Sequence, residues 1–593
     1  MLIKLLPVYS QLAGVDEEEQ FRIHTPTSSK LFFSKHQRET FEALLDPKIE
    51  VVFNTAMTGD GKSLAAYLPV LVRGWHAFGM YPTNELLRDQ RKQFEEYLRL
   101  FGLTTEQTPL TTLWGAEMAR LQNENNFRAR GEFLKERFSN HNVVLTNPDI
   151  FNLVMNYAYA RGSRMFTPQE LPYSLATNFD YFIMDEFHIF AMPQIVAALT
   201  AMLYLVNQSG YPKKFLFSSA TMSDSLREMV ARSGLKYREI KGAYGNGAAP
   251  HYRQVLYESD LHLHKLEQDD NAETWVRGHV DEMVSFWRSC EGRVKGAIIV
   301  NSVVAARRIA RFLEEALKPH NISIGENTGL TDEEQKRVAL EKQIVVGTAT
   351  IDVGVDFNIN FLVFESVNAG TFLQRLGRLG RVKRDQHAFA KYTAHALLSA
   401  KTPWVYDKLV KKFQERGIGE GDAVDRPTIL REVVAESFPN ENDFAAYAKR
   451  WGILQAAQVV NVLEDKKNQG AYTSLAEELK AKYATMFGVK SLEPAQKRYW
   501  AVANNEERGK KILDEVLGFR GSSPFQVACW DATVEPNAFL AYDLLPLVSS
   551  TNYVTVERED YERAVERRYA EPNQRAEPFN ALKYSLAVCR RDM

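Results

Sequence analysis

A glycine-rich turn between an apolar strand and a helix constrains the fold of this chain more than any other feature. Residues 49–54 form a short β-branched and aromatic run, and residues 64–72 have the apolar pattern of a helix. The segment 58–63, TGDGKS, lies between them. Its glycines let successive backbone N–H groups point at one anion, beside the N-terminus of the following helix. The pattern predicts a phosphate-binding loop in an α/β sheet, and the alternative is a turn that binds nothing.

The residues of this loop have distinct expected roles toward a nucleotide. Lys62 supplies a cation for the β and γ phosphates, and Ser63 supplies a hydroxyl for Mg²⁺. The first glycine of the usual eight-residue pattern is Ala56 here, which is a departure from it. The loop residues expected to contact the nucleotide are Thr58, Gly59, Asp60, Gly61, Lys62 and Ser63.

An acidic pair follows a second apolar run. Residues 181–184 predict a buried strand, and Asp185 and Glu186 stand at its carboxyl end, where ligands bind in open α/β sheets. Asp185 is expected to hold Mg²⁺, and Glu186 is expected to orient and deprotonate the water that attacks the γ phosphate. Such pairs are common on protein surfaces, so the interpretation depends on the strand and on the loop before it. Together the two elements predict nucleoside triphosphate hydrolysis.

Short β-branched runs alternate with helix-length segments over the first 400 residues, which is typical of parallel sheets covered by helices. The predicted strands are 49–54, 142–145, 181–184, 214–218, 296–300, 343–346 and 361–364. A glycine-rich segment, KGAYGNGAAP, interrupts the alternation. We predict an α/β fold with a first, ATP-binding lobe (1–241), a linker (242–250), a second lobe (251–400) and a mainly helical C-terminal domain (401–593).

Composition excludes several classes of protein. The 593 residues include 73 Lys and Arg and 75 Asp and Glu, so the formal charge is −2. This balance excludes a chain that coats nucleic acid by bulk attraction, but it leaves a local basic groove possible. Three cysteines without a C-x-x-C pair argue against a disulfide framework and favour a reducing cytoplasm.

Two apolar stretches are candidates for a signal peptide and for a membrane span, and neither has the required pattern. Residues 1–6 are interrupted at once by Pro7 and polar residues, so they predict an opening strand rather than a signal peptide. The longest apolar stretch, 189–206, contains Pro193 and Gln194 and predicts a buried helix rather than a membrane span. We therefore expect no membrane segment.

Further motifs, in matching order over residues 34–381, resemble those of the superfamily 2 helicases. Gln37, after His36, resembles the glutamine that reads adenine in that family. His188, after the acidic pair, is similar to the DExH variant. The resemblance implies two tandem RecA-like lobes that bind ATP and Mg²⁺ between them.

The same resemblance implies which residues contact a nucleic-acid strand and which couple hydrolysis to movement. Strand contacts in this family run along the sugar-phosphate backbone of one strand. The matching positions for strand contact are Pro82, Thr83, Thr146, Asn301, Ser302 and Thr348. The matching positions for coupling are Ser219, Ala220, Thr221 and His188.

Two glycine-containing motifs of the second lobe complete the resemblance. Residues 347–356 resemble motif V, in which Gly354 and Asp356 match nucleotide-contacting positions. Residues 374–381, QRLGRLGR, resemble motif VI. Its planar guanidinium groups suit phosphate oxygens and would reach the γ phosphate from the opposite lobe. The resemblance assigns catalytic roles to Gln374, Arg378 and Arg381 beside Lys62, Asp185 and Glu186.

A narrower resemblance, carried by residues 57–63, the element at 185–188 and the helical C-terminal third, is to the stand-alone helicase of type I-D CRISPR–Cas systems. It implies a monomeric, ATP-dependent motor on single-stranded DNA that is recruited by a CRISPR surveillance complex in antiviral defence. In related CRISPR helicases an HD nuclease precedes the motor, but the segment before Gln37 is too short to hold one. None of the twelve histidines is followed by aspartate. We therefore expect a separate nuclease subunit.

Two alternatives stay open on the sequence. One is an RNA helicase or a DNA-repair helicase with the same core, and the other is an ATP-gated clamp or recruitment module. The core motifs contact the backbone of the strand, and only a group that senses the 2′-hydroxyl separates RNA from DNA.

Overall fold

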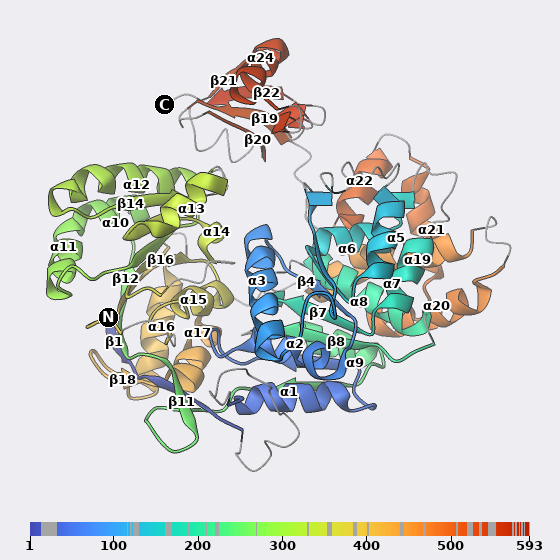
Figure 1. Cartoon of the computed structure of the whole chain (residues 1–593), viewed down its shortest axis with the longest axis horizontal. Coiled ribbons are helices and arrows are strands. Elements are labelled where there is room, and N and C mark those ends of the chain that lie inside the picture. Colours follow the sequence, from blue (N-terminus) through green and yellow to red (C-terminus); the bar gives the residue numbers. More distant parts are fainter. Residues whose placement is uncertain are drawn as a thin grey trace.

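The computed structural model places two α/β lobes side by side, with a smaller sheet beyond them at the C-terminal end (Figure 1). It describes residues 1–13, 32–115, 117–118, 121, 130–160, 169–187, 190, 192–208, 210–219, 224–267, 270–328, 331, 333–352, 358–382, 388–399, 402–438, 444–465, 470–505, 508–518, 526–532, 537–543, 553–571, 574–575, 578–579, 581–582, 585 and 587–591.

The first lobe contains a seven-stranded parallel sheet in the order β5-β6-β4-β7-β8-β3-β9. In that order the strands are Leu110–Leu113, Val143–Thr146, Ala77–Met80, Tyr181–Asp185, Lys214–Ser218, Val51–Asn54 and Tyr237–Ile240. The strands predicted at 49–54, 142–145, 181–184 and 214–218 are confirmed as β3, β6, β7 and β8. All residues of these four strands are buried, which explains why they read as continuous apolar runs.

Helices cover both faces of this sheet (Figure 1). They are α1 (Lys35–Leu45), α2 (Lys62–Arg73), α3 (Asn84–Leu100), α5 (Arg130–Asn140), α6 (Pro148–Met155), α7 (Glu170–Asn178), α8 (Met192–Gln208) and α9 (Asp224–Arg232). The buried helix predicted at 189–206 is confirmed as α8, which begins at Met192, next to the proline. Within the described part of the chain, no helix combines the length and apolarity needed to cross a membrane.

The second lobe contains an eight-stranded sheet in the order β14-β15-β13-β16-β17-β12-β1-β18. In that order the strands are Ile324–Asn327, Ile344–Gly347, Gly296–Ile299, Phe361–Ser366, Thr393–Leu398, Ser259–Lys265, Leu2–Leu5 and Ala423–Val424. The strands predicted at 296–300, 343–346 and 361–364 are confirmed as β13, β15 and β16. The helices of this lobe are α10 (Ala272–Gly278), α11 (Val280–Ser289), α12 (Val303–Leu317), α13 (Glu333–Glu341), α14 (Ala349–Asp352) and α15 (Ala369–Leu376).

The N-terminal strand belongs to the second lobe, although the sequence division placed it in the first. The opening strand is confirmed as β1, but it pairs antiparallel with β12 and parallel with β18. Its apolar side chains, Ile3 and Leu5, are almost fully buried in the core of the second lobe. The chain then turns into β2 (Val8–Gln11), so the first thirteen residues join the two lobes.

A three-stranded antiparallel sheet lies where the sequence predicts a linker. Its order is β10-β2-β11, with β10 at Tyr244–Gly245 and β11 at Tyr252–Leu256. The predicted linker 242–250 therefore contains a short strand, and it pairs with the N-terminal segment. The exact boundaries of the lobes stay a prediction.

The region after residue 401 is divided among three places. Helices α16 (Trp404–Glu415) and α17 (Arg431–Ser437) pack on the core of the second lobe. Helices α19 (Ile453–Leu463), α20 (Thr473–Phe487) and α21 (Glu493–Ala503) share the core of the first lobe. A separate sheet near the C-terminal end has the strand order β20-β19-β22-β21 and is accompanied by helix α24 (Arg558–Arg568). The strands of this sheet are Ala538–Asp543, Gln526–Asp531, Ala587–Arg591 and Tyr553–Thr555.

The prediction of a mainly helical C-terminal domain therefore misses a sheet. Its strands are three to six residues long, and they come between charge-rich segments in which the alternation fades. One buried ion pair fixes this sheet to the second lobe. Nη1 of Arg307, on α12, lies 2.9 Å from Oδ2 of Asp531, on β19, and both side chains are nearly inaccessible to solvent.

A group of histidines lies at the edge of the second lobe's core. The ring of His395, on β17, stacks on His262 with ring centroids 4.8 Å apart, and its Nδ1 lies 3.1 Å from Nε2 of His264. Burial lowers the pKa of His395 to about 2 and that of His264 to about 4, and neighbouring histidines act in the same direction. Both rings are therefore neutral in the folded protein at neutral pH.

These histidines predict acid lability of the second lobe. An unfolded histidine takes up a proton near pH 6.5, whereas folded His395 does not, so the free energy of unfolding falls as the pH drops below 6.5. Between pH 6.5 and 5, His395 alone accounts for a loss of at most about 2 kcal/mol. We expect His395→Phe, which keeps a stacked ring, to flatten the fall of the thermal midpoint over this range. The matched control is the exposed His251→Phe, and equal slopes for the two variants would contradict the assignment.

Candidate active site

One cavity of ≈ 370 Å³ opens between the two lobes. The first lobe contributes the glycine-rich loop, the acidic pair and the exposed side of α3, and the second lobe contributes Arg378 and Arg381. Of the predicted residues, those that line this cavity are Thr58, Gly59, Gly61, Lys62, Ser63, Asp185, Glu186, Arg378 and Arg381. The structure therefore brings together residues from motifs that are more than 300 positions apart in the chain.

The loop has the backbone geometry of an anion cradle. Gly59 and Gly61 have φ angles of 90° and 84°, which residues with a Cβ rarely adopt. A Cβ on Gly61 would also come within 2.5 Å of Nε2 of Gln37. Helix α2 begins at the next residue, Lys62, so its first N–H groups and its dipole face the cavity that the loop lines.

Gln37 supports this loop from α1. Its Nε2 donates to the carbonyl oxygen of Gly61 at 2.9 Å, and its Oε1 accepts from the N–H of Ser34 at 2.8 Å. The adenine-reading role that the resemblance implies for Gln37 stays a prediction, and its side chain does not line the cavity. In this structure the glutamine fixes the backbone of the loop.

Lys62 lies inside the loop that it is expected to serve. Its Nζ donates to the carbonyl oxygen of Ala56 at 2.9 Å, across the turn. Burial lowers the pKa of Lys62, while the charges of Glu186 and Asp185 raise it. The buried ammonium group has only a neutral carbonyl acceptor in this structure. A charged phosphate oxygen would be a stronger acceptor and would replace it.

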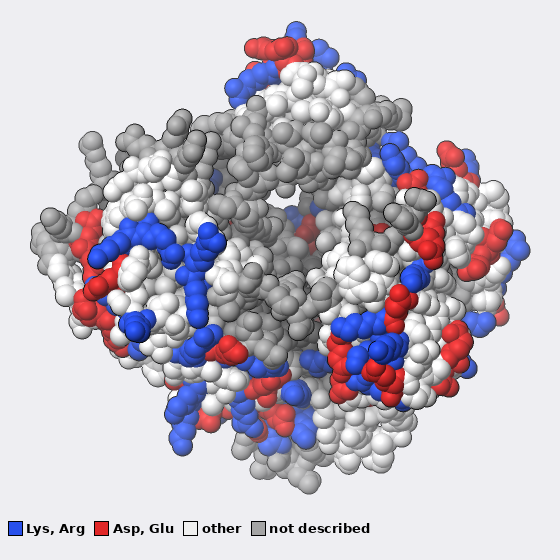
Figure 2. Space-filling model, turned by 180° about the vertical axis from the view of Figure 1, so that it is seen from behind, with Lys and Arg blue, Asp and Glu red and all other residues white. Residues whose placement is uncertain are grey.

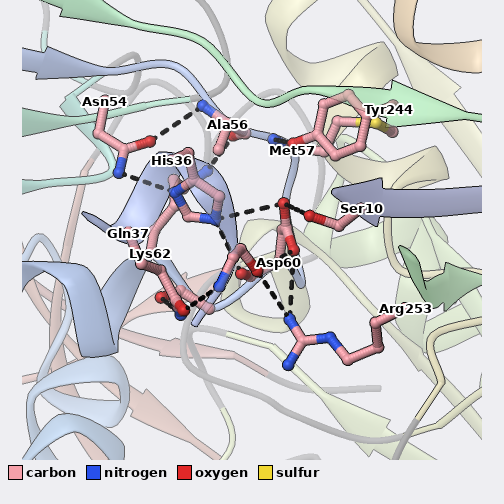
Figure 3. A network of polar contacts seen from close by, with 12 residues as sticks. Ser10, His36, Gln37, Asn54, Ala56, Met57, Asp60, Lys62, Tyr244 and Arg253 are labelled. Carbon is pink, nitrogen blue, oxygen red and sulfur yellow. Dashed lines mark hydrogen bonds and ion pairs between the residues drawn. The ribbon is translucent and has the colours of Figure 1, made fainter. Parts of the chain in front are cut away.

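Asp60 departs from the predicted role, because its carboxylate is turned into a buried network (Figure 3). Ser10 donates to one carboxylate oxygen at 2.8 Å, and Arg253 lies 3.3 Å from the other. Nε2 of His36 lies 3.2 Å from Oδ2. Burial alone raises the pKa of Asp60, but the hydrogen bond and charge of His36 lower it below its ordinary value. The network removes a negative charge from the path of an incoming phosphate.

The proton positions in this network follow from its donors. Nδ2 of Asn54 lies 3.2 Å from Nδ1 of His36 and also donates to Oγ1 of Thr40, while Oδ1 of Asn54 accepts from the N–H of Ala56. Because Asn54 donates, Nδ1 of His36 accepts, and Nε2 carries the proton that it donates to Asp60. Both ring nitrogens of His36 therefore have a hydrogen-bond partner within the network.

The sequence analysis missed the residues that approach this loop from the three-stranded sheet. Ser10 lies on β2 and Arg253 on β11, while the hydroxyl of Tyr244, on β10, accepts from the N–H of Met57 at 2.6 Å (Figure 3). No motif marks these positions, and the glycine-rich context of Tyr244 predicts only a linker. The strands that join the lobes thus contact the phosphate loop directly.

The acidic pair stands at the carboxyl end of β7, as predicted. Burial, with the neighbouring charge of Glu186, raises the pKa of Asp185 to about 7, and Lys62 opposes the shift. Glu186 has a φ of 49°, an uncommon backbone conformation for a residue with a side chain. Such strain persists at positions where function requires a particular side-chain direction.

The donor set of this cavity fits magnesium. The hydroxyl of Ser63 and the carboxylates of Asp185 and Glu186 are hard oxygen donors that line one cavity with the phosphate loop. Nε2 of Gln90 donates to the Ser63 hydroxyl at 3.0 Å and orients it. Ser63 and Asp185 would hold the ion, which would neutralise charge on the phosphates. Among the described residues, no group of three or more His, Cys, Asp and Glu side chains is placed to hold a metal ion, so this site would rest on two carboxylates and a hydroxyl.

The second lobe delivers its arginines from the end of α15. Arg381 lies directly over the loop, because a Cβ on Gly59 would meet its Cδ and Nε at 3.5 Å. Its Nε donates to the carbonyl oxygen of Gly377 at 3.0 Å. Arg378, which is nearly buried, lines the same cavity. Gln374 is also nearly buried but does not line it.

The predicted strand-contacting residues follow the carboxyl ends of parallel strands in both lobes. Thr83 caps α3 after β4, and Ser302 caps α12 after β13. Asn301 accepts from Nη1 of Arg375 at 3.0 Å, and Thr348 follows β15. Pro82 precedes Thr83 at the same edge.

Thr146 differs from this prediction. Its side chain is fully buried, and its hydroxyl donates to the carbonyl oxygen of Leu113 at 2.8 Å, so it holds two strands together rather than facing a strand of nucleic acid. The following residue, Asn147, caps α6. On the face shown in Figure 2, acidic and basic residues are intermixed over much of the described surface.

One of the residues predicted to couple hydrolysis to movement lies beside the phosphate loop. Ser219 is described, and its N–H donates to the carbonyl oxygen of Asn54 beside the loop. The positions that lie outside the described residues are His188, Ala220, Thr221, Gly354 and Asp356.

Comparisons with protein families agree with this geometry. Residues 34–229 match the DEAD/DEAH box helicase family, and residues 272–384 match the C-terminal part of the CRISPR-associated nuclease/helicase Cas3. The chain therefore contains a DEAD/DEAH box helicase segment followed by a Cas3-like segment, and it is an ATP-hydrolysing enzyme. The two matched segments contain the phosphate loop and the arginine motif, respectively. No curated protein matches the chain.

Solved structures share the fold of this chain. MrfA, a DUF1998 helicase crystallised with DNA, is 14% identical with a TM-score of 0.60, over 100% of this chain and 76% of that one. Cas3 of T. fusca with AMPPNP is 16% identical with a TM-score of 0.52, over 90% and 62%. Mss116p with ssRNA and AMP-PNP is 14% identical with a TM-score of 0.50, over 82% and 92%. The prediction of two RecA-like lobes is confirmed.

Proposed function

We propose that this helicase is an ATP-driven translocase on single-stranded DNA. The observation that carries the proposal is that one cavity joins the phosphate loop and acidic pair of the first lobe to Arg378 and Arg381 of the second. Such an arrangement makes hydrolysis depend on lobe closure, since the arginines arrive with the opposite lobe. As the lobes close and open, each lobe in turn binds the DNA strand more tightly than the other.

Within this cycle the residues have separate tasks. The loop N–H groups and Lys62 hold the β and γ phosphates, and Glu186 orients the attacking water and accepts its proton. Mg²⁺ would supply charge neutralisation at Ser63 and Asp185. Arg378 and Arg381 stabilise the charge that develops in the transition state.

The choice of DNA is supported by two of the comparisons. The match at 272–384 is to Cas3, and MrfA, which shares the fold, was crystallised with DNA. Mss116p, with the same core, was crystallised with ssRNA, so an RNA helicase is the alternative.

ATPase measurements with both polymers separate these two functions. We expect single-stranded DNA to stimulate hydrolysis more than RNA of the same sequence. If about five phosphates are contacted, the affinity for the strand falls roughly 10²-fold between 50 and 200 mM salt, because bound counterions are released. Equal stimulation by RNA would favour the alternative, and stimulation without strand displacement would favour an ATP-gated clamp.

We further propose that this motor acts in type I-D CRISPR interference, beside a surveillance complex and a separate nuclease subunit. The Cas3-like match supports the CRISPR context. An HD nuclease needs a His-Asp pair and further histidines as metal ligands, and no His-Asp pair occurs in the sequence.

The purified chain is therefore expected to leave single-stranded DNA intact in Mg²⁺ or Mn²⁺. The measurement is gel analysis of labelled DNA after prolonged incubation, with Lys62→Ala run in parallel. Cleavage that survives in Lys62→Ala would show a nuclease site in this chain and contradict the separate subunit.

A further inference from the structure

A buried arginine lies behind the phosphate loop without a counter-charge. Arg426 begins a π-helical turn (Arg426–Leu430) that precedes α17, and its side chain is 3% exposed. Its Nη2 donates to the carbonyl oxygen of Tyr257 at 3.0 Å and to the hydroxyl of Ser259. Its Nε and Nη1 are buried and have no hydrogen-bond partner among the described residues.

Such a group is expensive to keep in a folded protein. A buried guanidinium without a carboxylate has lost its water, and the hydrogen bonds of Nη2 offset only part of that cost. Burial alone lowers the pKa of Arg426 to about 9. The presence of this buried arginine is explained if an anion binds to its free N–H groups during the ATPase cycle.

A cavity of ≈ 50 Å³ provides the space for that anion. Arg426 and Arg431 line it together with apolar side chains such as Leu256, Leu373 and Leu376. None of the described residues that line it is acidic. The volume admits roughly three to five water-sized groups, which suits a tetrahedral oxyanion and excludes a nucleotide.

The position of this cavity relates it to hydrolysis. Thr58 lines both this cavity and the larger one that holds the phosphate loop. Gly377 lines the smaller cavity and precedes Arg378, which lines the larger one, and a Cβ on Gly377 would meet Cβ of Thr58 at 3.5 Å. The two cavities are therefore neighbours: Thr58 of the loop and the turn at Gly377–Arg378 lie between them.

We propose that Arg426 and its cavity form a second oxyanion site, which binds the inorganic phosphate released by ATP hydrolysis at the neighbouring site. The proposal rests on the proposed ATPase function for the source of the phosphate. The unpartnered Nε and Nη1 lie on different edges of the planar guanidinium, so each offers a separate charge-assisted N–H donor to an oxyanion oxygen. The apolar walls strengthen these bonds by excluding water.

Equilibrium dialysis of the full chain with labelled inorganic phosphate, in the absence of nucleotide, tests the site. In a Lys62→Ala background, which removes the cation of the hydrolysis site, we expect one phosphate to remain bound. Adding Arg426→Gln should weaken that binding about 10- to 100-fold, because charge-assisted hydrogen bonds are lost. The matched control adds the exposed Arg288→Gln instead and should bind as the background does.

A second variant and a second anion complete the test. Arg426→Lys keeps the charge but loses the planar array of N–H donors, and it should bind phosphate about tenfold more weakly. If the glutamine variant does not fold, the lysine variant provides the test. Equal phosphate affinity with and without Arg426 would overturn the proposal, and so would acetate binding as tightly as phosphate. Failure of the ATPase function itself would appear separately, as wild-type turnover in Lys62→Ala.

Discussion

Lys62→Ala is expected to reduce ATP hydrolysis to background, with the fold intact. Its ammonium group is the cation that the first lobe places inside the phosphate loop, and no other lysine lines the cavity among the described residues. Removing one preorganised charge from a phosphoryl-transfer site costs roughly 10²–10³-fold in rate or more. Because burial already lowers the pKa of Lys62, the loss of its charge should not lower the thermal midpoint.

The measurement is steady-state phosphate production with saturating single-stranded DNA, together with a thermal melt. The matched control is Lys92→Ala, which removes an exposed lysine from α3 of the same lobe. Hydrolysis by Lys62→Ala at the rate of this control would contradict the assignment of the loop. Loss of activity with a lowered melting midpoint would instead indicate a structural role.

The chain's order of motifs was sufficient to predict the central part of this site. The loop at 58–63 and the pair at 185–186 each follow a buried strand, and parallel strands bring their carboxyl ends to one edge. The strand that precedes each motif is therefore enough to predict that the loop and the acidic pair lie close together. The arginine motif came from family resemblance, since only the packing of two lobes places Arg381 over Gly59.

The network around Asp60 could not be predicted, because its members are brought together by long-range pairing. Ser10 and Arg253 reach the loop from strands whose register depends on the three-stranded sheet. The position of β1 in the second lobe has a similar cause, since a four-residue apolar strand fits the edge of either sheet. The sequence also does not indicate that Nε and Nη1 of Arg426 lack partners among the described residues. Arg426-Pro427 indicates only the start of a helix.

These missed contacts give the phosphate loop a mechanical link to the second lobe. Residues 2–5 belong to the sheet of the second lobe, and residues 8–11 belong to the sheet that contacts the loop. Tyr244 and Arg253 lie on either side of β2 in that small sheet. A change in the distance between the lobes therefore acts on the same strands that hold Met57 and Asp60.

Arg378→Ala and Arg381→Ala are each expected to lower the rate of hydrolysis by roughly 10³–10⁵-fold, the range for arginines that act on the transition state of phosphoryl transfer. The affinity for ATP should change little. The loop, Lys62 and the two residues proposed to hold magnesium all belong to the first lobe, so they are expected to bind the ground state without help from the second.

The arginine test separates rate from affinity by measuring turnover and the binding of a fluorescent ATP analogue on the same preparations. Arg288→Ala, an exposed change on α11 of the same lobe, is the matched control. Arg381 has a further expected signature: its Nε bond to Gly377 holds the guanidinium over Gly59, so Arg381→Lys should be nearly as slow as Arg381→Ala. An ATP affinity that falls in step with the rate would assign both arginines to ground-state binding, and the second lobe would then bind nucleotide rather than complete the catalytic site.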